Sequence, residues 1–169
     1  MAMTINIPGI GKQTYEHVVF DLNGTLATDG HISETLAIAL QELSTHLEVH
    51  ILTAGTHGGV DVIAGITGIT PVMIQTGEDK ERYVRRLSHV IAVGNGAVDT
   101  FMLNAADLSI CVLGEEGAYT SSAILYNIFI MLSVKGGPWW TVYLLLFNQT
   151  APYYLKSITP CLRKHAIVW

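Results

Sequence analysis

The alternation of short apolar runs with helix-like segments along residues 14–118 constrains the fold of this chain more than any other feature. The apolar runs have the length and composition of buried strands and lie at 17–21, 48–55, 70–76, 89–96 and 107–114. Between them, apolar residues recur at helical spacing in 33–47, 58–69, 78–87 and 97–106. Strands and helices that alternate across short loops predict an α/β domain that is doubly wound around a mostly parallel sheet.

The two ends of the chain are expected to extend this core. Residues 3–9 and 14–21 predict an N-terminal β-hairpin that turns at residues 8–11 and leads into the first buried strand. The whole chain, residues 1–169, is expected to form a single domain, because this length is enough to bury a sizeable core. Within that domain, residues 119–169 would either complete the core or form an interface.

Residues 119–169 differ from the rest of the chain in charge and hydropathy. They carry four Lys or Arg and no acid, whereas residues 1–118 carry fourteen acids and five Lys or Arg. Their apolar runs, 121–134 and 139–147, are both shorter than the roughly 18 to 20 residues of a membrane-spanning helix. We favour a last strand or helix pair packed on the sheet; the alternatives are a surface for homo-oligomerisation, for another partner or for a membrane.

The charge balance limits the kinds of partner that are expected, and the cysteines and the N-terminus indicate the cellular compartment. The acidic balance of residues 1–118 argues against nucleic acid as a partner. Cys111 and Cys161 have neither metal-binding nor redox spacing, and the N-terminus lacks the pattern of a signal peptide. We therefore expect a reducing, cytoplasmic setting.

Polar residues near the ends of the predicted strands indicate a common site. They are Asp21, Thr53, Lys80, Asn95 and Asp99. In doubly wound sheets, ligands bind outside the carboxyl ends of the strands, so these side chains are expected to face one crevice. A carboxylate, a hydroxyl, an ammonium group and a second acid form a set that is suited to phosphoryl transfer.

Four stretches of sequence carry these residues: "DLNGTLA", "ILTAG", "GEDK" and "VGNGAVDTFMLNAADLSICVLGEEGA". In order and spacing they resemble the four motifs of the haloacid dehalogenase-like (HAD) superfamily. The resemblance is greatest to the phosphorylation domain of P-type ATPases, as found in small free-standing soluble relatives, and it covers residues 14–118. It implies a three-layer Rossmann-like core and a Mg²⁺-dependent hydrolase of the phosphatase or ATPase type.

The resemblance also implies roles for the residues at the matching positions. Asp21 would be the nucleophile that becomes an aspartyl phosphate, Thr53 would hydrogen-bond the phosphoryl group, and Lys80 would offset its negative charge. The Mg²⁺ ligands would come from Asp21, Asn23, Asn95 and Asp99. The substrate-binding loops would contain Asn23, Gly24, Thr25, Ala54 and Gly55.

Three positions depart from the family pattern. Phosphatases of the superfamily carry an acid at the position of Asn23, which protonates the leaving oxygen and later activates water. Asn95 replaces an acid of the metal site, and Gly55 stands where the family has Asp. We therefore expect slow turnover, and the alternative is a phosphate-binding or regulatory module with little turnover. A second alternative, a membrane-associated accessory protein, rests on the basic, aromatic segment 119–169.

The spacing of the motifs leaves no room for an inserted cap domain. Asp21 and Thr53 are separated by 31 residues (22–52), and Thr53 and Lys80 by 26 (54–79). The site is therefore expected to be capless and open, so that a large substrate reaches it or another segment covers it. The expected substrate is a phosphorylated small molecule or a phosphoprotein.

Two further patterns are weaker. The segment "GNGAVD" ends in Asp99 where the dinucleotide-binding fingerprint has glycine. His46 and His50 lie four residues apart, but the intervening Glu is misplaced for the H-E-x-x-H motif, and a strand is expected to begin there. Surface histidines are therefore expected at these positions, in preference to a zinc site.

Overall fold

The computed structural model describes residues 1–7, 11–28, 30–55, 59–113, 128–132, 142–148 and 151–158, and the last three ranges are described as backbone strands. The main sheet contains eight strands: β3 (His17–Asp21), β4 (Glu48–Thr53), β5 (Val72–Met73), β6 (Val90–Gly94), β7 (Leu108–Leu113), β8 (Ile128–Leu132), β9 (Val142–Asn148) and β10 (Ala151–Ile158). Their order is β10-β9-β8-β7-β6-β3-β4-β5. The strands β3 to β8 pair in parallel, whereas β9 and β10 pair in antiparallel fashion. The predicted α/β fold with a mostly parallel sheet is confirmed.

The predicted N-terminal hairpin is also confirmed. Its strands β1 (Met3–Ile7) and β2 (Gly11–Tyr15) pair in antiparallel fashion and form a separate two-stranded sheet. The turn between them, residues 8–10, is outside the described part of the chain. The hairpin packs on the main sheet because Ile7 and Tyr15 are buried in one cluster with Val18 of β3.

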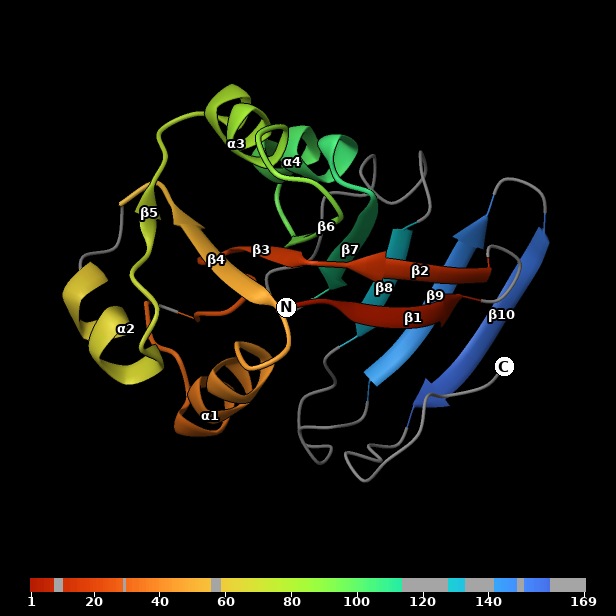
Figure 1. Ribbon diagram of the computed structural model, residues 1–169, viewed down its shortest axis with the longest axis horizontal. Helices are drawn as coiled ribbons and strands as arrows, with labels where there is room; N and C mark the ends of the chain where they lie inside the picture. The colour runs from red at the N-terminus through yellow and green to blue at the C-terminus, as the bar shows by residue number, and fades with distance from the viewer. Residues whose placement is uncertain are drawn as a thin grey trace.

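Four helices form the outer layers of the described fold (Figure 1). They are α1 (Glu34–Leu43), α2 (Val60–Thr67), α3 (Gly77–Val84) and α4 (Thr100–Ala105). Helices α1 and α2 cover one face of the sheet, and α3 and α4 cover the other face. Together with the sheet they make the predicted three-layer arrangement.

Local sequence sets where these helices begin and end. Ser33 caps α1, because its Oγ accepts a hydrogen bond from the Leu36 amide at 3.2 Å. Thr76 caps α3 in the same way, through the amide of Asp79 at 3.1 Å. Helix α2 ends at Gly68, whose φ of 73° is in the left-handed region that glycine adopts without strain.

The alternation of side chains along the central strands supplies a separate core on each face. The α3/α4 face buries the apolar residues Val19, Leu52, Val84, Val90, Ala92, Met102 and Leu103. The α1/α2 face buries Leu22, Leu26, Ala27, Leu40, Ile51 and Ile63. Because both faces are covered, the strand β6 (Val90–Gly94) is apolar and buried along its whole length.

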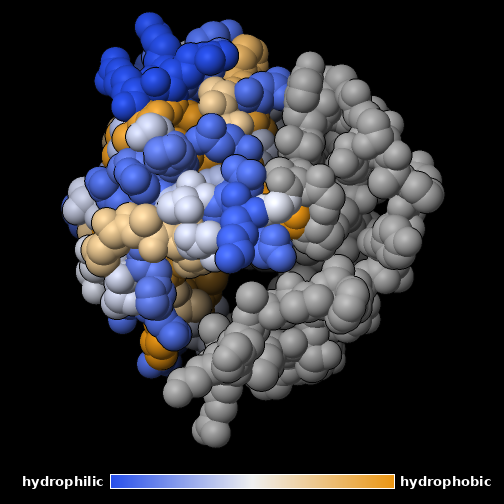
Figure 2. Space-filling model, turned by 45° about the vertical axis from the view of Figure 1, so that its right-hand side comes forward, coloured by the Kyte–Doolittle hydropathy of each residue, from blue (hydrophilic) through white to orange (hydrophobic). Residues whose placement is uncertain are grey.

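Helix α3 is the most polar of the four helices, and one of its faces is buried while the other is charged and faces solvent. Gly77, Lys80 and Val84 are buried on its inner face. Its outer face carries ion pairs, one between Arg82 and Asp79 and one between Arg85 and Glu81. Figure 2 shows hydrophilic side chains gathered over this end of the molecule. A lysine on the buried face of such a helix needs a partner inside the protein.

The strands at 128–132, 142–148 and 151–158 lengthen the sheet beyond β7, and β10 forms one of its edges. The connecting residues 114–127 and 133–141 are outside the described part of the chain; they include most of the apolar run 121–134 and the first three residues of the run 139–147. None of the described helices is long and apolar enough to cross a membrane.

Candidate active site

A buried lysine joins two carboxylates at the carboxyl end of the parallel strands. The Lys80 Nζ atom lies 2.5 Å from Asp21 Oδ1 and 2.6 Å from Asp99 Oδ1. The side chains of Lys80, Asp21 and Asp99 are only 5%, 10% and 3% exposed. We call these three residues the acid–lysine trio. Its charge-assisted hydrogen bonds fix the ammonium group between the two acids.

Each member of the trio lies on a different element. Asp21 is the last residue of β3, and Lys80 lies one turn into α3. Asp99 ends the short 3-10 turn η1 (Ala97–Asp99), which follows β6 and leads directly into α4. Because β3 and β6 are parallel neighbours, the two acids come to the same edge of the sheet.

The loop after β6 holds Asp99 in place. Its Oδ2 atom accepts hydrogen bonds from the backbone amides of Asn95 at 3.0 Å and Gly96 at 2.8 Å, while Oδ1 contacts Lys80. A Cβ atom at Gly94 would lie 2.7 Å from Cβ of Asp99 and 2.8 Å from Cε of Met102. Glycine at position 94 is therefore what allows Asp99 to approach the end of the strand.

The electrostatics of the trio leave a net negative charge. Burial raises the pKa of Asp21 to about 6, repulsion from Asp99 adds to this rise, and Lys80 opposes it. Burial lowers the pKa of Lys80, but attraction by Asp21 and Asp99 outweighs burial, so the pKa lies above its ordinary value. At neutral pH, two carboxylates and one ammonium group carry one net negative charge away from water. A cation at this site would compensate that charge.

The loop after β3 adds oxygen atoms near the trio. Gly24 has a φ of 75°, and its amide donates to the Ala27 carbonyl at 2.8 Å, which closes a tight turn. Thr25 Oγ1 donates to Asn95 Oδ1 at 3.4 Å and so connects this loop with the loop after β6. Among the described residues, Asn23 Oδ1 is the buried side-chain atom without a hydrogen-bond partner. A buried amide oxygen in this position is suited to a ligand or a cation.

The donor set of the site fits a hard divalent cation. Asp21, Asn23, Asn95 and Asp99 offer carboxylate, amide and main-chain oxygen atoms in the two connected loops. Mg²⁺ prefers oxygen ligands and takes only a few of them from the protein. The unpartnered oxygen of Asn23 and the net negative charge of the trio agree with such an ion.

The loop after β4 begins beside the loop after β3, because the Leu22 amide donates to the Leu52 carbonyl at 3.0 Å. Thr53 is buried, and its Oγ1 accepts a hydrogen bond from the Gly55 amide at 3.3 Å. Gly55 has a φ of 69°, in the left-handed region, whereas the Cε atom of Met73 that a Cβ there would meet ends a flexible, exposed side chain that can move aside. The Asp of the family pattern would be strained at this position, which gives a physical reason for the glycine.

Some of the predicted site residues are in direct contact in the structure, and others are not. Asp21, Lys80 and Asp99 touch one another, and Thr25 contacts Asn95. Thr53 is hydrogen-bonded within its own loop, and Ala54 is exposed on that loop. The catalytic and metal-binding roles of these residues remain predictions.

A second polar cluster lies at the opposite end of the same strands and was not predicted. It consists of His17 in β3 with Glu48 and His50 in β4. The expectation of surface histidines is wrong for His50, whose side chain is 10% exposed, whereas His46 is exposed. The signal in the sequence was the spacing of Glu48 and His50, which places both on one face of a strand beside His17.

The parallel sheet, its helical layers and a carboxylate at the carboxyl end of β3 define a Rossmann-like α/β domain. No protein-family model matches the chain. An uncharacterized protein of Methanocaldococcus jannaschii is 44% identical over 41 residues, a match that covers 24% of this chain and 44% of that protein. The chain therefore spans less than half the length of this curated relative.

Solved structures confirm the predicted fold. The deoxy-D-mannose-octulosonate 8-phosphate phosphatase of Haemophilus influenzae, in a cobalt-bound form, matches with a TM-score of 0.54 and 18% identity over 69% of this chain and 77% of that chain. The 3-deoxy-D-manno-octulosonate 8-phosphate phosphatase of Moraxella catarrhalis was solved with a magnesium ion, a phosphate ion and a KDO molecule. It matches with a TM-score of 0.50 and 20% identity over 68% of this chain and 75% of that chain. The chain has the haloacid dehalogenase-like fold of these phosphatases.

Proposed function

We propose that this protein is a Mg²⁺-dependent phosphohydrolase or phosphotransferase that works through an aspartyl phosphate on Asp21. The observation that carries the proposal is the buried contact of Lys80 with both Asp21 and Asp99 at the carboxyl edge of the sheet. Two phosphatases with the same fold support it, and one of them was solved with magnesium and phosphate ions.

Asp21 is the nucleophile in this proposal. With its pKa raised by burial to about 6, the carboxyl group is ionised at neutral pH and is more basic than an ordinary aspartate. A carboxylate oxygen attacks phosphorus while the bond from phosphorus to the leaving oxygen breaks. The Lys80 ammonium group, already next to Asp21, stabilises the negative charge on the transferring phosphoryl group.

Mg²⁺ would be held by Asp21, Asn23, Asn95 and Asp99. When bound, the ion supplies further charge neutralisation on the phosphoryl oxygen atoms. Asn95 contributes a neutral oxygen where the family has an acid. We therefore expect weaker Mg²⁺ binding than in a site with an acid at that position.

The leaving group and the attacking water lack an acid–base helper at position 23. The amide of Asn23 cannot protonate a leaving alkoxide, and it cannot accept a proton from water in the second step. The favoured substrates are therefore phosphates with good leaving groups, such as acyl or aryl phosphates. Hydrolysis of the phosphoenzyme is expected to be slow.

The described part of the chain has no inserted cap domain between the residues of the site. The helix α1 and the strand β4 lie between Asp21 and Thr53, and α2, β5 and the start of α3 lie between Thr53 and Lys80, so both segments belong to the core. Without a cap, the reacting group of a phosphorylated small molecule or a phosphoprotein can reach Asp21.

Aryl phosphate hydrolysis and beryllium fluoride binding test the proposal together. Beryllium fluoride with Mg²⁺ mimics an aspartyl phosphate, so it should bind wild type and fail to bind the Asp21→Asn variant. Hydrolysis of an aryl phosphate should require Mg²⁺ and disappear in the same variant. Asp61→Asn is the matched control, because Asp61 is exposed on α2. Wild-type activity in a folded Asp21→Asn protein would show that Asp21 is not the nucleophile.

A phosphate-binding module with little turnover is the second candidate function. The observation that favours it is the presence of Asn23 and Asn95 at positions where phosphatases that resemble this chain would carry acids. This candidate predicts that beryllium fluoride binds to wild type in the presence of Mg²⁺ although no aryl or acyl phosphate is hydrolysed.

A further inference from the structure

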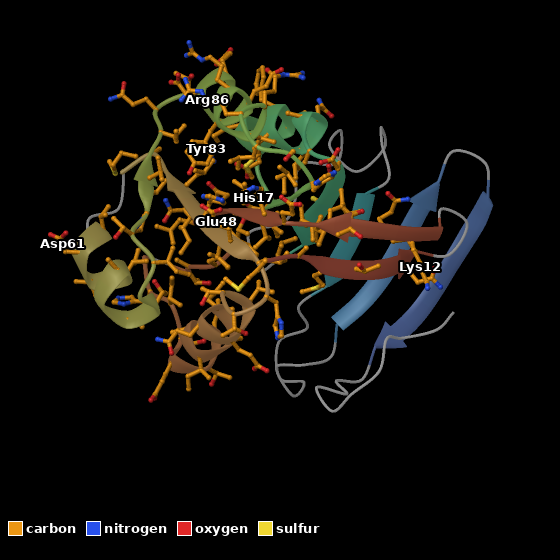
Figure 3. All side chains as sticks on the ribbon, in the orientation of Figure 1. Lys12, His17, Glu48, Asp61, Tyr83 and Arg86 are labelled. Carbon is orange, nitrogen blue, oxygen red and sulfur yellow. The ribbon has the colours of Figure 1, made fainter. Side chains whose placement is uncertain are left out.

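Three side chains of metal-ligating type meet at the amino-terminal ends of β3 and β4. The Nδ1 atom of His17 lies 3.3 Å from Glu48 Oε2 and 3.2 Å from His50 Nε2. The Nε2 atom of His50 lies 3.8 Å from Glu48 Oε1. Figure 3 shows His17 and Glu48 close together at the sheet, with Tyr83 of α3 nearby. We call these three residues the His–Glu–His cluster.

The pairing of the two strands builds this cluster. His17 is the register partner of Glu48 in the parallel pair β3–β4. His50 follows two residues after Glu48, so its side chain projects from the same face of β4. All three ligand atoms lie within 4.8 Å of one another.

The distances match the ligand shell of a small metal ion. Zn²⁺ binds nitrogen and oxygen ligands at about 2.0 to 2.2 Å in tetrahedral geometry, so two ligand atoms of one ion are about 3.3 to 3.5 Å apart. In the His–Glu–His cluster, His17 Nδ1 lies 3.2 Å from His50 Nε2 and 3.3 Å from Glu48 Oε2, which is close to that value. The other carboxylate oxygen of Glu48, Oε1, lies 3.8 Å from His50 Nε2. Two imidazoles and one carboxylate with a fourth, open position form a common zinc-site composition.

We infer that His17, Glu48 and His50 bind a divalent transition-metal ion of the Zn²⁺ type, with a solvent molecule as the fourth ligand. Glu48 is 66% exposed, so an ion can reach the cluster from solvent. Imidazole ligands select such ions over Mg²⁺, which prefers oxygen atoms alone.

A hydrogen bond from outside the cluster orients one of the ligands. The Tyr83 hydroxyl lies 3.0 Å from His50 Nδ1. When Nδ1 carries the proton and donates it to this oxygen, the lone pair of Nε2 faces His17 and Glu48. Metal-bound histidines almost always have such a partner on the other ring nitrogen.

This metal site is separate from the acid–lysine trio. His17 and Asp21 are the first and last residues of β3, and four strand residues span about 13 Å. The inference does not depend on the proposed phosphatase function, because it rests on residues that take no part in that function.

The experiment is a Zn²⁺ titration of the full-length chain by isothermal calorimetry, in an excess of Mg²⁺ that saturates the oxygen-ligand site. We expect wild type to bind one Zn²⁺ per chain and to unfold at a higher Tm when Zn²⁺ is present. His50→Ala should abolish this binding, and Glu48→Gln should weaken it at least tenfold. Tyr83→Phe should weaken it by about 10- to 100-fold, because it removes the partner that orients His50.

Two control variants locate the ion. His46→Ala removes an exposed histidine outside the cluster, and Asp21→Asn alters the other site, so both should bind Zn²⁺ as wild type does. Circular dichroism checks that each variant is folded; Glu48→Gln changes a mostly exposed side chain and is the variant least able to disturb the core. The inference is wrong if wild type binds no Zn²⁺, or if folded Glu48→Gln and Tyr83→Phe proteins bind it with wild-type affinity.

Discussion

Replacing Lys80 by methionine should destabilise the protein in a manner that depends on pH. Methionine has nearly the length of lysine and keeps the apolar stem buried, but it removes the ammonium group. Asp21 and Asp99 then lose their shared partner, although their side chains are only 10% and 3% exposed. Removing one partner from a buried ionic network typically costs about 3 to 5 kcal/mol, because the remaining charge is uncompensated. We expect a loss of this order at pH 7.5 in the absence of divalent cations.

The sign of the pH effect follows from Asp21. Its pKa in the folded wild-type protein, about 6, lies above its ordinary value of 3.8, so the folded state takes up a proton first as the pH falls. The tighter binding of this proton in the folded state stabilises the protein fully below about pH 4, and the stabilisation is lost as the pH rises through about 6. It amounts to about 3 kcal/mol for a shift of about two units. Lys80 opposes the rise in the pKa of Asp21, so its removal should raise that pKa further. Acid should therefore stabilise the variant more than wild type.

Urea unfolding, followed by circular dichroism in EDTA at pH 7.5 and pH 5, measures both effects. The free-energy deficit of Lys80→Met should be large at pH 7.5 and smaller at pH 5. Lys12→Met is the matched control, because Lys12 is exposed on β2 and its replacement should change stability by less than about 0.5 kcal/mol. A Lys80→Met protein as stable as wild type at pH 7.5, or a deficit that grows at pH 5, would refute the coupling of the three charges.

Three further predictions follow from the same site and from the sheet. Asn23→Asp should raise the rate of alkyl phosphate hydrolysis by up to about 10²- to 10⁴-fold in steady-state assays. Deamidation of Asn23 would produce the same acid in wild type, so intact mass spectrometry should show that the wild-type sample is not deamidated. Gly94→Ala should displace Asp99 from Lys80, lower Mg²⁺-dependent turnover and cost about 1 to 3 kcal/mol of stability in urea titrations. A chain that ends after Gly117 loses β8, which pairs with β7, and should fail to unfold cooperatively; a soluble, cooperative truncation would contradict this.

Much of the fold and part of the site could be predicted because the information is local. The apolar strand 17–21 ends in Asp21, and the rule for parallel sheets places such an end at the ligand-binding edge. The same reasoning placed Asp99 near Asp21. It did not predict that one lysine would touch both acids. That contact depends on the packing of α3 and on the absence of a side chain at Gly94, and neither can be derived from the spacing of motifs.

The His–Glu–His cluster was missed because its residues are distant in sequence. His17 and His50 are 33 positions apart, and only the register of β3 and β4 brings them together. The zinc motif H-E-x-x-H requires two histidines at helical spacing, as His46 and His50 are, whereas the strand that begins at Glu48 has a period of two. Register of this kind is set by the hydrophobic pattern of the whole sheet and by the lengths of its connections.

Helix α3 links the two ends of β3. Lys80 contacts Asp21 at the carboxyl end of the strand, and Tyr83, on the next turn of α3, contacts His50 beside the amino-terminal end. Asp21, His17 and their shared neighbour Val19 all project toward the α3 side, because alternate residues of a strand face the same way. A shift of β3 by one residue relative to the sheet would turn these side chains to the opposite face and disrupt both the trio and the cluster. The two sites therefore depend on one strand register and on one helix, although they use different ligand chemistry.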